Sequence, residues 1–431
     1  MVIMSNRTQQ KAKTTAGKSS PPRARMKSTD DYVDNILRVS DGNLKRYFSP
    51  TERDELLKRI KCLRGSGLQT REKIDRFCNI YADYCKEIRR AEYPKADAGF
   101  CKKINAATPD NVHIIWRDCV ESMAKMESES IQLMVTSPPY YNARQYSQWE
   151  NLDTYLADMS RVIAESYRVL ENHRAFVFNV GDITGNDNRY TRSVWGARRI
   201  PLGAYFINIF EKNGFTFVDD FIWDKGQVES QRHKNGDTPF PMYQYPMNAY
   251  EHIMVFVKHS LDSKPYPCPV CGCLKVNGNA YSGVGIKSWE CKNRKCFKRS
   301  PADRGKRFSA RSVMMDSLKS EQNKIDKEFV TRWRRDIVSL SPVIKINCNG
   351  KNVLGHTAPF PFEIPEFAIK MLSGVGERVY DPFAGSFTTA IQAYKMGRVG
   401  IGSELHRAKF EESVLLNIKK HCGSRKVKVL R

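Results

Sequence analysis

The sequence predicts an α/β fold in which a mostly parallel sheet is flanked by helices. After about residue 111, short apolar runs alternate with helix-like stretches, a pattern typical of strands that pair side by side with helices packed on them. The alternation stops near residue 258 and resumes near 352, and the segment between carries 19 basic and 8 acidic residues. The length of 431 residues allows roughly two or three folded units.

The chain begins with segments that lack this alternation. Residues 1–28 carry seven basic residues and no acid, so we expect a disordered arm that either contacts phosphates non-specifically or is simply a free terminus. Residues 29–104 are expected to form a helical extension. One helix should follow Ser49 with Pro50 at its first position, and an apolar stripe over 74–88 indicates core packing or a partner helix. Dimerisation and DNA clamping both remain open for this extension.

The α/β pattern divides into residues 105–258 and 351–431, with the basic segment 259–350 inserted between them. The expected strands are Val112–Trp116, Ile131–Thr136, Phe176–Val180, Phe217–Trp223, His252–Val257 and Arg378–Tyr380, and the clearest helices are Tyr155–Leu170, Tyr205–Lys212 and Thr388–Lys395.

The overall charge indicates a polyanionic partner. Lys and Arg total 71 against 47 acidic residues, an excess that most often accompanies nucleic-acid binding. The longest apolar run, Ile253–Val257, is far shorter than the ~20 residues of a membrane span, and no signal-peptide pattern opens the chain. We therefore expect a cytoplasmic protein without a membrane partner, associated with the nucleoid if the source is prokaryotic.

A proline-rich loop follows the expected strand Ile131–Thr136. Pro138 and Pro139 end the strand and fix an extended turn, which presents Ser137 and Tyr140 at the sheet edge where α/β folds bind ligands. A hydroxyl, a carbonyl and an aromatic face suit the binding of a flat base by its amino group. Taken alone, the same residues are also compatible with an ordinary loop or a proline-rich recognition motif.

A glycine turn follows a strand near the other end of the chain. The segment Val379–Thr389 runs from a strand through Asp381 and Gly385 into a helix, whose N-terminus favours electronegative groups. Glu404 ends the next strand about 20 residues further on, where an acid typically binds ribose hydroxyls.

These motifs together resemble a known family. TSPPYYN at 136–142, YEHIMVFVK at 250–258, HTAPFPFEIP at 356–365 and DPFAGSFTTAIQAYKMGRVGIGSE at 381–404 are similar to the permuted, β-group DNA amino-methyltransferases. The resemblance implies a Rossmann-like methyltransferase fold, S-adenosyl-L-methionine as cofactor, and a catalytic half that precedes the cofactor half with a target-recognition region between them. It also implies that the strand end Trp223–Lys225 forms a pocket wall. The residues implied for catalysis are Ser137, Pro138, Pro139 and Tyr140, and those for the cofactor are Asp118, Phe360, Pro361, Asp381, Pro382, Phe383, Ala384, Gly385, Ser386 and Glu404.

One position departs from the family pattern. The family's turn often has a second glycine where this chain has Phe387, and a bulky residue does not adopt a positive φ cheaply. We expect an ordinary backbone at 387 with the ring lining the site. The alternative is that cofactor binding is weakened.

Four cysteines of the insert indicate a metal site. Cys268-x2-Cys271 and Cys291-x4-Cys296 form two close pairs that suit a tetrahedral structural Zn²⁺, and Cys273 is an alternative ligand. The stretch 292–311 carries nine basic residues and one acid, which favours a DNA-facing surface over a merely solvated one. The expected DNA contacts are Lys292, Arg294, Lys295, Lys298, Arg299, Lys306, Arg307 and Arg311.

We therefore expect a sequence-specific methyltransferase acting on double-stranded DNA, in restriction-modification or genome marking, with a cognate restriction endonuclease as a candidate functional partner. Serine rather than aspartate at 137 favours, by resemblance, the N4 amine of cytosine over the N6 amine of adenine, which is the alternative. Methylation at cytosine C5 needs a Pro-Cys nucleophile, and Pro267-Cys268 lacks its companion motif. A catalytically inactive DNA-binding protein, with Phe387 blocking the cofactor, is a further alternative.

Overall fold

The computed structural model describes residues 50–63, 76, 80, 84, 96–141, 149, 151–184, 192–193, 196–197, 199–226, 248–259, 266–281, 286–296, 307–343, 360–423 and 426–431. It separates the chain into two compact units, Met1–Pro94 and Lys95–Arg431. No helix within these described stretches combines the length and the apolar character needed to cross a bilayer.

The first unit contains helix α2, Pro50–Lys61, which confirms the predicted helix start. Ser49, the basic arm 1–28 and most of the stripe 74–88 lie outside the described residues. The unit ends at Pro94 and not at 104 as expected, because helix α4 (Ala98–Asn105) buries Phe100 and Ile104 in the core of the second unit.

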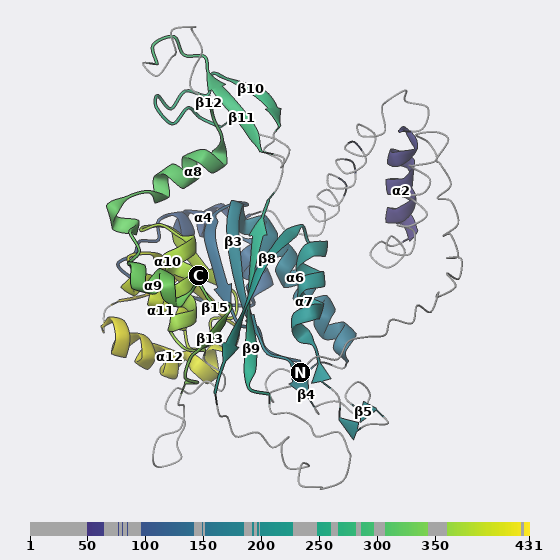
Figure 1. Cartoon of the computed structure of the whole chain (residues 1–431), viewed down its shortest axis with the longest axis vertical. Coiled ribbons are helices and arrows are strands. Elements are labelled where there is room, and N and C mark those ends of the chain that lie inside the picture. The colour runs from purple at the N-terminus through teal and green to yellow at the C-terminus, as the bar shows by residue number, and fades with distance from the viewer. Residues whose placement is uncertain are drawn as a thin grey trace, which may run out of the picture. The chain divides into compact units, whose positions relative to one another are not determined.

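A nine-stranded sheet forms the centre of the second unit, in the order β13-β8-β9-β3-β2-β14-β15-β1-β16 (Figure 1). All neighbours pair in parallel except β9, which runs antiparallel to both β3 and β8. The predicted mostly parallel α/β fold is thereby confirmed. The strands are β1 Val112–Trp116, β2 Ile131–Thr136, β3 Leu170–Val180, β8 Phe215–Asp224, β9 Tyr250–Lys258, β13 Ile337–Ser339, β14 Arg378–Asp381, β15 Val399–Glu404 and β16 Val427–Val429, beside the short pairs β4 Ile183–Thr184 with β7 Arg199–Ile200 and β5 Arg192–Ser193 with β6 Gly196–Ala197.

Helices cover both faces of this sheet (Figure 1). Side chains alternate along β2, so that Leu133 and Val135 enter one buried layer and Met134 enters the other. Two groups of four described helices cover the two faces. The first group packs on the side of Met134, and the second packs on the opposite side and beside β1. The first group is α4 Ala98–Asn105, α5 Cys119–Ala124, α6 Leu152–Val169 and α7 Leu202–Lys212, and the second is α9 Lys327–Arg332, α10 Glu363–Leu372, α11 Thr388–Lys395 and α12 Arg407–Cys422.

The inserted segment 259–350 has two parts. A three-stranded antiparallel sheet of β10 Val276–Tyr281, β11 Lys287–Cys291 and β12 Arg307–Phe308 surrounds a small core, and we name the described residues of 266–308 the cysteine body. Helix α8 Ala310–Leu318, the 3-10 turn η2 Glu321–Asn323, α9 and β13 follow. The expected single insert is corrected here, because β13 completes the main sheet beside β8 and Trp333 stacks on Phe367 with ring centroids 4.2 Å apart.

The cysteine body is attached at the edge of the sheet where the parallel strands begin. Strand β9 leads into it and runs antiparallel to β3, so Lys258 lies at the edge opposite to the carboxyl ends of β2 and β3. Tyr266 packs against the core of the cysteine body and interacts electrostatically with Glu171 and Arg174 at the start of β3. The placement at this edge is unexpected for a region that reads the base to be methylated.

Candidate active site

The loop Ser137–Tyr140 follows β2 at the carboxyl edge of the sheet, as predicted. The Tyr140 hydroxyl donates a hydrogen bond to Glu251 Oε2 at 2.8 Å, and the Ser137 hydroxyl lies 3.4 Å from the Tyr140 hydroxyl oxygen. Burial and then the charge of Glu251 raise the pKa of Tyr140, so the phenol stays protonated at neutral pH. Serine and tyrosine are therefore held as neutral polar groups at one edge of the sheet.

Glu251 is a member of this site that the sequence did not single out. It lies at the start of β9, and its Oε1 accepts a hydrogen bond at 3.0 Å from the Nζ of Lys225, the residue directly after β8. A methyl group added at Gly181 would lie 3.0 Å from Glu251 Cγ and 3.3 Å from Tyr140 Cε2, so the glycine leaves room for both side chains. Only the antiparallel β8–β9 pairing brings Glu251 and Lys225 together, and this pairing has no local signal in the sequence.

Asp381 connects the catalytic loop to the glycine turn. Its buried carboxylate accepts hydrogen bonds from the Thr136 hydroxyl at 2.5 Å, the Thr389 hydroxyl at 2.8 Å and the Phe383 backbone N–H at 3.0 Å. Burial raises the pKa of Asp381 to about 6. Since the side chain is only 1% exposed, its hydrogen bonds organise the turn from inside.

Two half-buried acids lie beside this turn. Glu404, at the end of β15, accepts hydrogen bonds from the backbone N–H groups of Gly385 at 3.2 Å and His406 at 3.0 Å, and burial raises its pKa. Asp118 follows β1, the next strand, and caps α5 by accepting from the Val120 N–H at 2.8 Å. The structure thus brings the predicted Asp118, Gly385 and Glu404 to one edge of three adjacent strands.

The other residues predicted around the cofactor are more buried. Pro382, Ala384 and Ser386 are buried in the turn and Phe383 is half-buried. Phe360 and Pro361 precede α10, and Phe360 packs with Val379 and Ile364 in the layer beneath the sheet. Their predicted role in closing a pocket stays a prediction, and 351–359 lies outside the described residues.

Phe387 contradicts the expectation of an ordinary backbone. Its φ of 62° and ψ of 28° lie in the left-handed region, immediately before α11. The ring is fully buried with Ile114 and Phe410, 6.1 Å from the Trp116 ring, and does not line an open site. A methyl group at Gly402 would lie 2.8 Å from the ring, so the neighbouring strand makes room for it with a glycine. The gain from burying the ring outweighs the backbone cost of about 1–2 kcal/mol.

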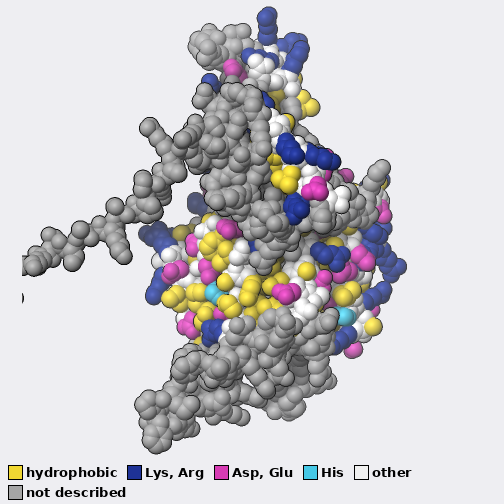
Figure 2. Space-filling model, turned by 90° about the vertical axis from the view of Figure 1, so that its right-hand side faces the viewer, with side chains coloured by type: hydrophobic (Ala, Val, Ile, Leu, Met, Phe, Trp, Pro, Cys, Tyr) yellow, Lys and Arg dark blue, Asp and Glu magenta, His cyan; other side chains and the backbone are white. Residues whose placement is uncertain are grey.

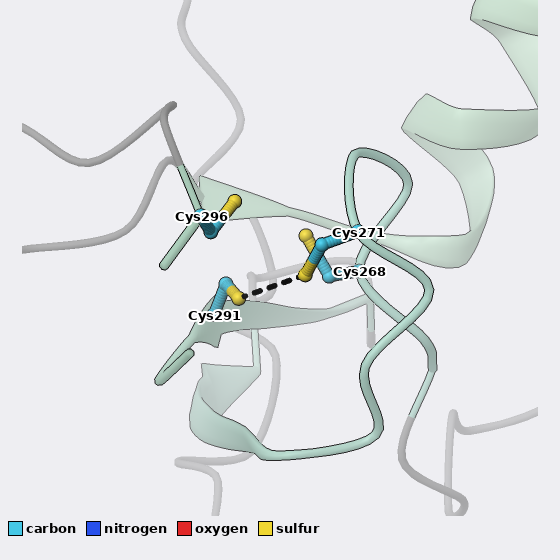
Figure 3. Close-up of side chains that lie close together, drawn as sticks. All are labelled: Cys268, Cys271, Cys291 and Cys296. Atoms are coloured by element: carbon cyan, nitrogen blue, oxygen red, sulfur yellow. Dashed lines mark hydrogen bonds between the residues drawn. The ribbon is translucent and has the colours of Figure 1, made fainter. Parts of the chain in front are cut away.

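A separate cluster of four thiols lies in the cysteine body, three of them in its buried core (Figure 3). The Sγ atoms of Cys268, Cys271, Cys291 and Cys296 all lie within 4.8 Å of one another, and those of Cys271 and Cys291 are 3.7 Å apart. Cys273 instead accepts a hydrogen bond from the Lys275 backbone N–H. The predicted set of four cysteines is thus brought together, without the alternative Cys273.

The predicted DNA contacts on and near the cysteine body are exposed wherever they are described. Three of them lie between two of the cysteines, and Lys298, Arg299 and Lys306 lie outside the described residues. The exposed ones are Lys292, Arg294, Lys295, Arg307 and Arg311.

Comparisons with known proteins identify relatives of this chain. A family model described as DNA methylase, for N6 and N4 methyltransferases, matches residues 131–414. The chain is 36% identical over 293 residues to the Type II beta methyltransferase M.BslI of Bacillus sp. strain NEB-606, covering 68% of this chain and 26% of that protein. The chain thus spans about a quarter of the length of M.BslI. It is 23% identical over 321 residues to the Type II methyltransferase M.PvuII of Proteus hauseri, covering 70% of this chain and 82% of that protein.

Two solved structures are similar at low identity. The putative DNA modification methylase TTHA0409 of Thermus thermophilus, complexed with S-adenosyl-L-methionine, has a TM-score of 0.48 at 23% identity and covers 74% of this chain and 99% of that one. The PvuII DNA methyltransferase (cytosine-N4-specific) has a TM-score of 0.44 at 17% identity and covers 75% of this chain and 98% of that one.

Proposed function

This chain belongs to the DNA methylase family of N6 and N4 methyltransferases, whose model matches residues 131–414, and we propose that it methylates the exocyclic N4 amine of cytosine in double-stranded DNA. One observation supports this most directly. The hydrogen bond between Thr136 and Asp381 ties the start of the Ser137–Tyr140 loop to the glycine turn, so the groups that would hold the base and the cofactor lie side by side. The substrate implies a cytoplasmic location, on the nucleoid in a prokaryote.

The loop residues would activate the amine by hydrogen bonding. The amine lone pair is delocalised into the base ring, and acceptors that bind the amine hydrogens draw it out of conjugation. The Ser137 hydroxyl oxygen and the Pro138 carbonyl oxygen would serve as these acceptors. Serine is too weak a base to remove the proton first, so methyl transfer precedes proton loss. Tyr140 would stack on the base after it leaves the helix.

The donor set fits S-adenosyl-L-methionine. Two half-buried carboxylates, Asp118 and Glu404, flank a turn whose Gly385 has a φ of 48°, which allows its backbone close to a ligand. Glu404 would hold the ribose hydroxyls, Asp118 a further polar edge, and the turn 381–386 the methionine part. When bound, the cofactor supplies the electrophilic methyl group.

The test is methyl transfer from labelled cofactor to mixed genomic DNA, followed by digestion to nucleosides. Wild type should place the label in N4-methylcytosine, and Ser137→Ala and Tyr140→Ala should lose it by about 100-fold or more, the range of a lost transition-state contact. Label found only in N6-methyladenine would show that the choice of base is wrong. A wild-type protein that binds DNA but shows no cofactor binding at millimolar concentration would instead support a binding-only function.

We also propose that the four thiols hold a structural Zn²⁺. Four ligands at about 2.3 Å from zinc place tetrahedral sulfurs about 3.8 Å apart, close to the 3.7 Å between Cys271 and Cys291. Metal analysis of the purified protein should give about one zinc per chain. A Cys268→Ser, Cys291→Ser variant that retains its zinc would refute this ligand set.

Sequence specificity and a restriction-modification role are further parts of the proposal, supported by the Type II names of M.BslI and M.PvuII. A cognate endonuclease would then be a functional partner that cuts the same sequence. Genomic DNA modified by this enzyme should resist cleavage by such an endonuclease.

A further inference from the structure

The cysteine body carries a strongly basic, exposed surface. Its described residues contain six lysines and arginines and a single acid, Glu290. Lys292, Arg294 and Lys295 are exposed on the turn between Cys291 and Cys296, and Arg307 is exposed on β12. Figure 2 shows Lys and Arg side chains gathered at the upper end of the molecule, which holds β10–β12 in Figure 1.

The cysteine body is attached to the main sheet far from the loop Ser137–Tyr140. Glu251, which bonds Tyr140, and Lys258, which leads into the cysteine body, are the second and last residues of β9. At about 3.3 Å per residue, the seven steps between them span ~23 Å along the strand.

The second connection between the cysteine body and the main sheet lies at the same edge of that sheet. Asn323 of η2, beyond α8, accepts a hydrogen bond at 2.8 Å from the backbone N–H of Val375, in the turn that precedes β14. Leu318 at the end of α8 lies beside Gly374 of the same turn, and Val313 of α8 packs against the cysteine core. Both connections therefore hold the cysteine body at the edge where the parallel strands begin.

We propose that the cysteine body is a second DNA-binding site, which contacts phosphates of a stretch of duplex other than the target site and does not select the base to be methylated. The proposal rests on the proposed function, since DNA is the polyanion that a DNA methylase meets. Phosphate contacts add affinity uniformly across sequences, whereas base selection needs side chains in the groove beside the flipped base. Only base selection requires nearness to Ser137 and Tyr140.

The thiol cluster explains how so small a body can present these charges rigidly. Its buried core comprises Trp289 and Phe308 besides three of the four clustered cysteines. So few apolar residues rarely stabilise a fold alone, and a metal bound by Cys268, Cys271, Cys291 and Cys296 would supply the missing free energy.

The test compares wild type with a Lys292→Ala, Arg294→Ala, Lys295→Ala variant, which leaves the cysteines and the buried aromatic residues intact. A matched control removes three exposed lysines from α4 and α12, Lys102→Ala, Lys419→Ala and Lys420→Ala. The probe for affinity is sheared genomic DNA titrated over a range of salt concentrations. Base choice is read by sequencing the sites that each protein methylates in genomic DNA.

The first variant should bind DNA about tenfold or more weakly at low salt, and the slope of log affinity against log salt should fall by about 2–3. Its set of methylated sequences and its rate at saturating DNA should match those of wild type and control. A changed set of methylated sequences would overturn the proposal in favour of target reading. Unchanged affinity would overturn DNA binding here and favour a protein partner. A wild type that neither binds nor methylates DNA would instead sink the proposed function.

Discussion

The Phe387 position allows packing to be separated from cofactor access. Replacing Phe387 by alanine removes a fully buried ring that packs with Ile114, Phe410 and Trp116, and such a loss costs about 3–5 kcal/mol of unfolding free energy. Replacing it by glycine loses the same ring but also relieves the left-handed backbone at φ 62°, which costs a residue with a side chain about 1–2 kcal/mol. Phe387→Gly should therefore be about 1 kcal/mol more stable than Phe387→Ala, and about 2–4 kcal/mol less stable than wild type.

The assay is urea unfolding of the cofactor-free proteins, with isothermal titration of S-adenosyl-L-methionine into each. Because the ring points into the core, the dissociation constant for the cofactor should change by no more than about threefold, or about 0.6 kcal/mol. A Phe387→Gly protein as stable as wild type that binds the cofactor more than about tenfold tighter would refute this reasoning. That result would mean that the ring occupies space the cofactor needs.

Three further outcomes follow from the site. Burial raises the pKa of Asp381 to about 6, so this carboxyl ionises less readily in the folded than in the unfolded chain. The unfolding free energy of wild type should therefore fall by on the order of 2 kcal/mol as the pH rises from about 4 to 6. Urea unfolding of Asp381→Asn should show a smaller loss over the same pH range. Glu404→Ala should weaken cofactor binding about tenfold or more in the same titration, with little change in DNA affinity. Tyr140→Phe and Glu251→Ala should each slow single-turnover methyl transfer about tenfold. The double variant should be no slower than the slower single variant, because Glu251 acts through the Tyr140 hydroxyl. The control is Glu366→Ala, which breaks a Lys–Glu ion pair on α10.

Much of the fold follows from local patterns. Helix α11 has the predicted bounds Thr388–Lys395, and β1 and β2 match the predicted strands, because each is a short apolar run or a helix opened by a clear turn. Strand β13 escaped prediction because three residues, only one of them buried, have no periodicity. Its place is set by pairing with β8, more than 100 residues earlier in the chain. Such long-range pairing is decided by packing and not by propensity.

The site divides in the same way. Ser137, Tyr140, Asp381 and Glu404 stand at strand ends and in turns that the sequence marks clearly, and the structure brings them to one edge. Glu251 was missed because its partners come from other elements. Phe387 was misjudged because the cost of its backbone is visible in the sequence, whereas the space left by Gly402 on a neighbouring strand is not.

The two ends of β9 separate the proposed catalytic loop from the basic surface that is proposed to contact DNA phosphates. At its start, Glu251 accepts a hydrogen bond from the Tyr140 hydroxyl; at its end, Lys258 leads to the basic cysteine body. Phosphate contacts position a protein on the duplex, whereas only contacts to base edges and DNA shape carry sequence information. Charges on the cysteine body, which is attached ~23 Å along β9 from Glu251, would therefore lengthen the stay on DNA without changing which base enters. Removal of the proposed Zn²⁺ should then lower DNA affinity while cofactor binding persists, because the four clustered cysteines belong to the cysteine body, whereas the turn 381–386 and Glu404 belong to the main sheet.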